Sequence, residues 1–154
     1  NIPYDRIVEA YNECYIKDSR VLIQANLDLL HILKAYDELK LSGKLEKSKF
    51  IIGVAQSLAE WLLENERDNS MIAIHQLNIL QIIKRQRTFT EDEVNLLLQL
   101  SQNDSDMVKA GAFLLLDKLD VAQFVIQQFP EDVKARFMNF PIAIFAKVPN
   151  CCNN

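Results

Sequence analysis

The feature that most constrains the fold of this chain is the near-absence of helix breakers between Pro3 and Pro130. No proline interrupts this stretch, and its only glycines are Gly43, Gly53 and Gly111. Long runs of Leu, Ile, Ala, Lys, Glu and Gln fill the rest, and helices accommodate these residues well. The pattern predicts an all-α protein. It offers no glycine-rich phosphate loop, nucleophile elbow or βαβ alternation on which many enzyme sites are built.

Length and composition predict one globular domain of ordinary make-up. The chain has 154 residues, of which 49% are hydrophobic and 25% charged. Its net charge of −4 argues against a phosphate backbone as the main partner. No apolar run reaches the roughly 20 residues of a membrane span. We expect a single helical domain over residues 1–148 and a flexible polar tail over residues 149–154.

The ends of the sequence and its cysteines bear on two questions: whether the chain is part of a longer polypeptide, and in which compartment it resides. It begins at Asn1 with no signal-peptide pattern, and we expect it to be a fragment of a longer polypeptide. Three cysteines, with Cys151 and Cys152 adjacent, do not form a disulfide framework and favour a cytoplasmic protein. The adjacent pair has the length of a double-cysteine prenylation tail, but only Lys147 lies upstream, so a polar tail is the favoured interpretation.

Apolar spacing predicts six or seven helices joined by short connections. They are expected at about residues 4–16, 21–41, 45–66, 71–87, 91–102, 107–118 and 121–129, with a further turn or two at 131–138 and an apolar segment at 142–145. Short connections favour antiparallel hairpins, stacked as a short solenoid-like or bundle array. The helix at 45–66 has an apolar face so broad that we expect neighbours on two sides of it.

Capping residues predict where several of these helices begin and end. N-caps are expected in the Asp68–Ser70 turn, at Thr90 with Glu93 as a capping box, in the Asn103–Asp106 turn and at Asp120. Ser42 and Gly43 predict the end of the helix at 21–41. Gly111 lies between two alanines, and these small residues predict a close crossing of two helices.

One segment resembles a known class of helical repeat. Ala110–Pro130, AGAFLLLDKLDVAQFVIQQFP, is similar to a degenerate tetratricopeptide-type hairpin, with HEAT-like hairpins a comparable fit. The resemblance implies a solenoid segment and a protein-binding role. A 36-residue offset relates the helices that begin at Met71 and Met107; a true repeat and a chance match of two amphipathic helices both account for it. The following segment, PEDVKARFMNFPI, resembles the ends of helical modules attached to larger bacterial proteins.

Candidates for chemistry are few. His31 and His75 lack the spacings of a zinc or di-iron site, and we expect His31 to be a satisfied, part-buried structural residue. Glu60 and Glu64 are neighbours on one helix face, where a solvated surface explains them. Cys14 is expected to be a small buried hydrophobe. We therefore predict no catalytic residue, no metal ligand and no cofactor.

Two sets of residues are the candidate binding sites. Lys84, Arg85 and Arg87 form a basic cluster at the end of a helix, where cations complement the helix dipole; an anion contact is the alternative. The apolar set Phe137, Phe140, Ile142 and Phe145 is expected to fold back over the last hairpin as a cap; a docking strip for a partner is the alternative.

These observations predict a non-catalytic helical scaffold or protein–protein interaction module. Its expected partner is another protein, or another domain of the same polypeptide, held by apolar anchors on a helical surface. The alternative is a helical accessory region of a nucleic-acid-acting bacterial enzyme, for example of a defence type, that uses the basic cluster. A lipid-anchored regulator is a more distant third. The identity of the partner and the oligomeric state do not follow from the sequence.

Overall fold

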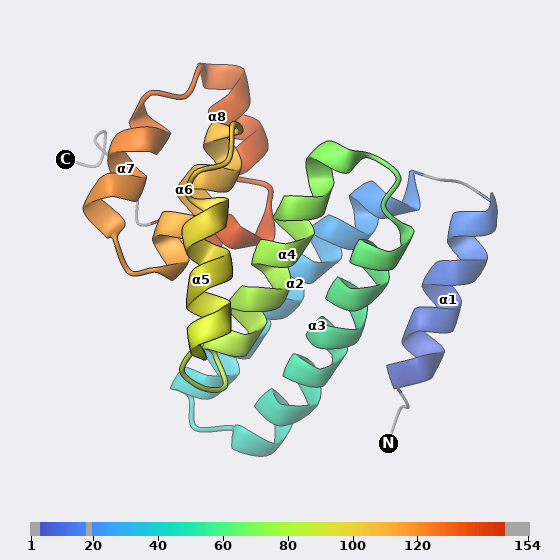
Figure 1. Cartoon of the computed structure of the whole chain (residues 1–154). Coiled ribbons are helices and arrows are strands. Elements are labelled where there is room, and N and C mark those ends of the chain that lie inside the picture. Colours follow the sequence, from blue (N-terminus) through green and yellow to red (C-terminus); the bar gives the residue numbers. More distant parts are fainter. Residues whose placement is uncertain (1–3, 18–19, 147–154) are drawn as a thin grey trace.

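The computed structural model describes residues 4–17 and 20–146 and is all-helical over those ranges (Figure 1), which confirms the predicted fold class. The helices are α1 (Tyr4–Lys17), α2 (Val21–Leu41), α3 (Leu45–Asn65), α4 (Asn69–Lys84), α5 (Glu91–Leu100), α6 (Asp106–Leu115), α7 (Leu119–Gln127) and α8 (Glu131–Phe137), followed by the 3₁₀ segment η1 (Pro141–Phe145). The predicted tail at 149–154, with Cys151 and Cys152, lies outside the described residues.

The helices pack against one another in a bundle-like arrangement. The two longest, α2 and α3, form an antiparallel hairpin, with α1 against one side of α3 and α4 against another (Figure 1). This confirms that α3 has neighbours on two sides. The shorter helices α5, α6 and α7 follow on the far side of α4, and η1 returns to contact α2, α4 and α6.

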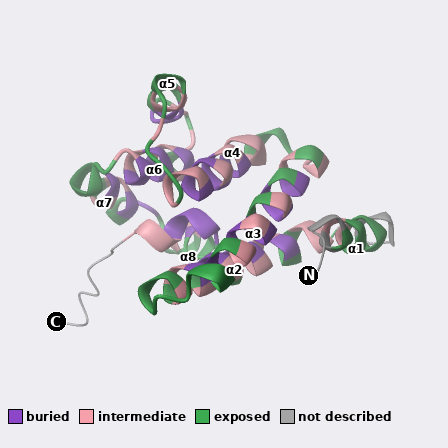
Figure 2. Cartoon of the chain, turned by 90° about the horizontal axis from the view of Figure 1, so that it is seen from below, coloured by how far each residue is buried: buried purple, intermediate pink, exposed green. Residues whose placement is uncertain are grey.

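Two hydrophobic cores lie on either side of α4. The α1–α3 core contains residues such as Leu29, Leu58 and Leu62, and the α4–η1 core contains residues such as Leu77 and Leu114. Figure 2 shows these buried faces in purple. Ile82 of α4 packs in the first core whereas Ile74 and Leu80 pack in the second. Because α4 contributes to both cores, it fixes their relative position.

Local capping confirms most of the predicted helix ends. Asp68 caps α4 by accepting from the Ser70 amide at 3.0 Å. Thr90 and Glu93 form the capping box that starts α5. Ser105 caps α6. The chain leaves α2 through Gly43, whose φ of 75° lies in the left-handed region that glycine tolerates best.

Three local expectations are wrong. α7 begins at Leu119 with Lys118 at its N-cap, so Asp120 lies in the first turn; the reversal comes early because Asp117 adopts a left-handed φ of 61°. His31 is exposed, because α2 turns residues such as Leu29 and Leu33 to the core and His31 the other way. Cys14 is also exposed.

Gly111 marks the predicted close helix crossing. A Cβ at this position of α6 would lie 2.7 Å from Cδ1 of Leu77 on α4 and 3.1 Å from Cγ1 of Ile142 in η1. No side chain larger than hydrogen fits there without displacing its neighbours. Gly111 therefore allows α6 to pack closely against α4 and η1.

In the described ranges, no helix has both the length and the apolar character needed to cross a bilayer.

Candidate partner-binding groove

The fold separates Arg85 from the other two residues of the predicted basic cluster, Lys84 and Arg87. Lys84 ends α4 and donates from Nζ to Asp117 Oδ2 at 3.1 Å and to the Leu115 carbonyl at 3.2 Å. Arg87 lies beyond the helix and donates to both carboxylate oxygens of Glu93 at 2.8 Å. Lys84 and Arg87 line one hollow of about 440 Å³. Arg85 is absent from the lining of this hollow and makes different contacts.

Arg85 joins three elements. Its Nε and Nη2 donate to the two oxygens of Asp37 on α2 at 2.9 and 3.1 Å, and its Nη1 donates to Gln81 Oε1 at 2.9 Å. The guanidinium carbon lies 4.8 Å from the centre of the Phe145 ring in η1. The Arg85 side chain is only 6% exposed. It therefore has a structural role at the meeting of α2, α4 and η1.

The ion pair between Arg87 and Glu93 changes the pKa of the Glu93 carboxyl. The hydrogen bond from Arg87, followed by that from the Thr90 backbone amide, lowers the pKa of Glu93 from its ordinary 4.5 to about 2. Since Glu93 also closes the capping box of α5, the ion pair stabilises a helix start. Each cation of the predicted cluster thus already faces a carboxylate of its own chain.

The apolar set predicted as a cap or docking strip packs into the core. Phe137 and Ile142 have no exposed surface, Phe140 is 8% exposed, and Phe145 is half-buried beneath Arg85. The segment folds back as expected, but η1 packs against α2 and α4 as well as against α6 of the last hairpin. Because Phe137 and Ile142 are fully buried, the four side chains do not share an accessible surface, whereas Phe140 lines an open pocket.

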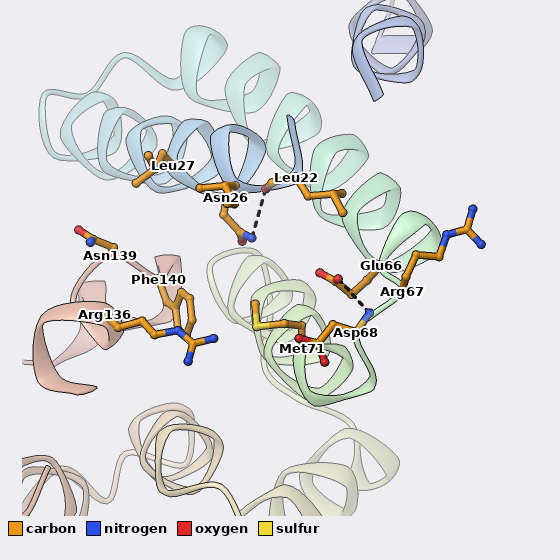
Figure 3. Close-up of a pocket in the computed structure, with 11 residues that line it drawn as sticks. Leu22, Asn26, Leu27, Glu66, Arg67, Asp68, Met71, Arg136, Asn139 and Phe140 are labelled. Atoms are coloured by element: carbon orange, nitrogen blue, oxygen red, sulfur yellow. Dashed lines mark hydrogen bonds between the residues drawn. The ribbon is translucent and has the colours of Figure 1, made fainter. Parts of the chain in front are cut away.

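That pocket is a groove of about 680 Å³ that no sequence pattern indicated (Figure 3). It lies between the first turns of α2, the α3–α4 turn, the start of α4 and the end of α8. Its apolar surface comes from Leu22 and Leu27 on α2, Met71 on α4 and Phe140 after α8, with Ile23 two-thirds exposed at its edge. We call this pocket the groove.

Opposite charges stand on the two sides of the groove. Asp68 lies at the α3–α4 turn, and Arg136 of α8 faces it with Met71 between them (Figure 3). The hydrogen bonds from Ser70 lower the pKa of the Asp68 carboxyl, and the positive charge of Arg136 acts in the same direction. Arg136 also lies over the Phe140 ring, 5.8 Å from its centre. The groove therefore combines an apolar floor with a charged rim of both signs.

Two further polar groups shape the walls of the groove. Glu66 is fixed by His75 Nε2 at 2.7 Å from Oε1 and by the Asp68 amide at 3.2 Å from Oε2. Asn26 donates from Nδ2 to the Leu22 carbonyl at 3.4 Å, while its Oδ1 is buried and accepts no hydrogen bond. An unpaired buried acceptor is costly, so a donor that reaches Asn26 would relieve that cost.

A buried polar strip on α4 is the other feature that sequence reasoning missed. His75, Asn78 and Gln81 are fully buried and, with Arg85, recur at helical spacing along one face. Gln81 donates to Asn78, and Arg85 donates to Gln81. Polar residues at regular intervals in an otherwise apolar helix were the available signal, and the sequence alone showed them only as interruptions of an apolar run.

The remaining candidates do not assemble into a site. Within residues 4–17 and 20–146, no group of three or more His, Cys, Asp or Glu side chains is placed to hold a metal ion. Glu60 and Glu64 are both exposed, and Glu60 accepts from Gln56 at 3.3 Å. These two carboxylates therefore lie on a solvated helix surface.

No family model, curated protein or solved structure matches the chain. Its function is therefore inferred from geometry and chemistry.

Proposed function

We propose that the protein is a non-catalytic helical interaction module whose groove binds an apolar segment of a protein partner or of another domain of the same polypeptide. The observation that carries this proposal is the groove itself, an open apolar hollow bounded by four separate segments of the fold. Its volume lies within the range of about 300–1,000 Å³ that is typical of binding sites.

The lining favours a peptide segment with large apolar side chains. Leu22, Leu27 and Met71 offer an aliphatic and thioether surface, and methionine adapts readily to the shape of a bound side chain. Phe140 adds an aromatic wall. Apolar anchors that enter such a groove from one face of a helix, or from alternate positions of an extended segment, are a common mode of peptide recognition.

The rim specifies the charge pattern of the occupant. Asp68 favours a basic side chain at one side of the groove, and Arg136 favours an acidic side chain at the other. The occupant is therefore expected to carry both charges around an apolar centre. The nucleic-acid alternative receives no such support, because Lys84, Arg85 and Arg87 are each paired with a carboxylate.

A displayed library of short random peptides, selected on the immobilised chain, tests this proposal. The enriched peptides are expected to contain two or three large apolar residues, with a basic residue on one side of them and an acidic residue on the other. Met71→Glu should abolish their binding, because it places a charge on the apolar floor. Leu98→Glu is the matched control, since Leu98 is an exposed leucine on α5 outside the groove.

A library that yields no enriched sequence, or enriched peptides that bind Met71→Glu as tightly as the unmodified chain, would rule out the groove as the binding site. Asp68→Asn should weaken peptides that carry a basic residue and leave binding of purely apolar peptides unchanged.

A further inference from the structure

The turn between α2 and α3 forms an exposed tip at residues 39–50, LKLSGKLEKSKF. It closes the hairpin of the two longest helices and projects at the lower end of the view in Figure 1. Residues 40–47 are all exposed (Figure 2). A Cβ built on Gly43 would meet no atom within 4 Å, so the tip stands in open space. We call this segment the α2–α3 tip.

The α2–α3 tip presents large apolar side chains to solvent. Leu41 is 89% exposed and Leu45 is 54% exposed. Beside them, Leu39, Phe50 and Ile51 line an apolar hollow of about 420 Å³. Single exposed leucines are ordinary on a protein surface, but here two of them and an apolar hollow are gathered at one projecting end.

The same tip is strongly basic, in a chain whose net charge is −4. It carries Lys40, Lys44, Lys47 and Lys49, against the single carboxylate of Glu46. Lys40 lies over the Tyr36 ring at 5.9 Å. No ion pair within the described residues involves the other three lysines, which are exposed.

A polar hollow extends this basic surface along α2. It measures about 520 Å³, and its lining includes His31, Lys34, Ser42 and Lys44, with Glu38 as its one carboxylate. Two ammonium groups and a hydroxyl are donors that suit the oxygens of a phosphate. Leu39 lines both this polar hollow and the apolar one, so donors for a headgroup and apolar surface adjoin each other.

We propose that the α2–α3 tip docks onto an anionic lipid surface, with Leu41 and Leu45 in the interfacial region and the lysines against the headgroups. Basic residues are attracted by the negative surface potential, and exposed apolar side chains partition into the interface. Reversible attachment of this kind needs both contributions together. The tip supplies both from one short segment.

The chemistry favours a lipid surface over a nucleic acid. A nucleic acid would use the lysines but gains nothing from two projecting leucines, and the one aromatic side chain of the tip, Phe50, is part-buried in the lining of the apolar hollow. A bilayer interface uses both kinds of residue.

Docking through the tip is compatible with the proposed groove and does not depend on it. The groove lies at the Leu22 end of α2 and the tip at the Leu41 end, about 30 Å apart along a helix that rises 1.5 Å per residue. A chain attached by its tip would therefore keep the groove away from the membrane and open to a partner.

Cosedimentation of the chain with phosphatidylcholine vesicles, with and without phosphatidylserine, tests the proposal. Binding is expected only to the vesicles with phosphatidylserine, and it should weaken as salt is added. Lys44→Gln should reduce binding about fivefold, which corresponds to the electrostatic contribution of one lysine at such a surface. Lys118→Gln, an exposed lysine far along the chain on the other side of α4, is the matched control and should bind as the unmodified chain does.

A second pair of variants tests the apolar contribution. Leu41→Asp and Leu45→Asp should each reduce vesicle binding more than tenfold, whereas Leu98→Asp should not. All three leucines are exposed, so none of these changes removes core packing. Equal binding to neutral vesicles, or full binding by both tip variants, would overturn the proposal. Tighter binding to duplex DNA or polyglutamate than to vesicles at the same salt would assign the lysines to another polyanion and overturn it as well.

Discussion

Two regions of this protein each contain basic side chains and a glycine. In one region these residues are packed against neighbouring elements, and in the other they are exposed to solvent. The first, the α4 junction, is where Arg85 joins α4 to α2 and η1 and where Gly111 lets α6 approach α4 and η1. The second is the α2–α3 tip, with Gly43 and its lysines. A Cβ on Gly111 would lie 2.7 Å from Leu77, whereas one on Gly43 would meet nothing within 4 Å. Arg85 is bound to Asp37, whereas Lys44 has no ion pair among the described residues.

The difference shows that a dense group of basic residues in the sequence does not tell whether those side chains are free to bind a partner. Arg85 meets Asp37 across 48 residues and Lys84 meets Asp117 across 33 residues. These partners come from α2 and from the α6–α7 connection, so only the tertiary structure shows that Arg85 and Lys84 are neutralised. At the tip, Lys40 lies at the end of α2, Lys44 in the turn, and Lys47 and Lys49 at the start of α3, and all four side chains remain exposed.

The largest expected effect on stability is at Gly111. Gly111→Leu should lower the free energy of unfolding by about 3 kcal/mol, at the upper end of the usual range for overpacking, because its side chain would overlap those of Leu77 and Ile142. Urea denaturation measures the loss. Gly43→Ala is the comparison at the tip, where only the strain of a left-handed residue, about 1 kcal/mol, is expected. Equal losses of unfolding free energy for Gly111→Leu and Gly43→Ala would contradict the claim that Gly111 is tightly packed and Gly43 is not.

The next largest effect is expected at Arg85. Arg85→Gln should cost about 2 kcal/mol, because it removes charge-assisted hydrogen bonds to Asp37 from a nearly buried position. Lys84→Gln should cost less than about 1 kcal/mol, since its partner Asp117 is largely exposed. A double-mutant cycle with Asp37→Asn separates the pair from the packing of Arg85 on Phe145. Additive losses in that cycle would show that the ion pair contributes nothing.

A smaller, pH-dependent effect is expected at the start of α5. Because the pKa of Glu93 is lowered to about 2 in the folded protein, the folded state binds this proton more weakly than the unfolded state does. The stabilisation is therefore complete above the ordinary pKa of 4.5 and is lost as the pH falls from about 4.5 towards 2. Glu93→Gln should flatten the curve of urea midpoint against pH in this window. An unchanged curve would mean that Arg87 and Glu93 do not pair in solution.

The smallest effect on stability is expected at the tip. Lys44→Gln should change the free energy of unfolding by less than about 0.5 kcal/mol, because the side chain is exposed and unpaired. The same variant is expected to weaken vesicle binding about fivefold. A clear loss of stability in thermal or urea unfolding would show that Lys44 has a structural partner, as Arg85 does.

Much of the fold follows from the sequence because it depends on local rules. The absence of proline, the Thr90–Glu93 capping box, Asp68 and Gly43 each act within a few residues of themselves. Gly111, between two alanines, also predicted a close crossing, although not which helix it meets. These signals account for the all-α class and for most helix ends within one to three residues.

The candidate site could not be predicted because it depends on contacts between distant segments. Leu22, Met71 and Phe140 form one floor only after α2, α4 and the end of α8 are in place. The burial of Phe137 and Ile142 likewise depends on how η1 returns to α4. The lysines of the tip were visible in the sequence, four within ten residues, but their significance depends on their projection from the fold.

The central claim is that partners bind surfaces that the fold leaves open, and not the apolar residues that it packs away. Titration calorimetry with an enriched peptide tests this most directly on three variants: Met71→Glu in the groove, Phe145→Ala beneath Arg85, and Leu98→Glu as the exposed control. We expect at least a tenfold loss of affinity for Met71→Glu and unchanged affinity for the other two, with circular dichroism confirming that each is folded. Unchanged affinity for Met71→Glu together with a loss for Phe145→Ala would contradict the account and place the binding site on the C-terminal apolar segment.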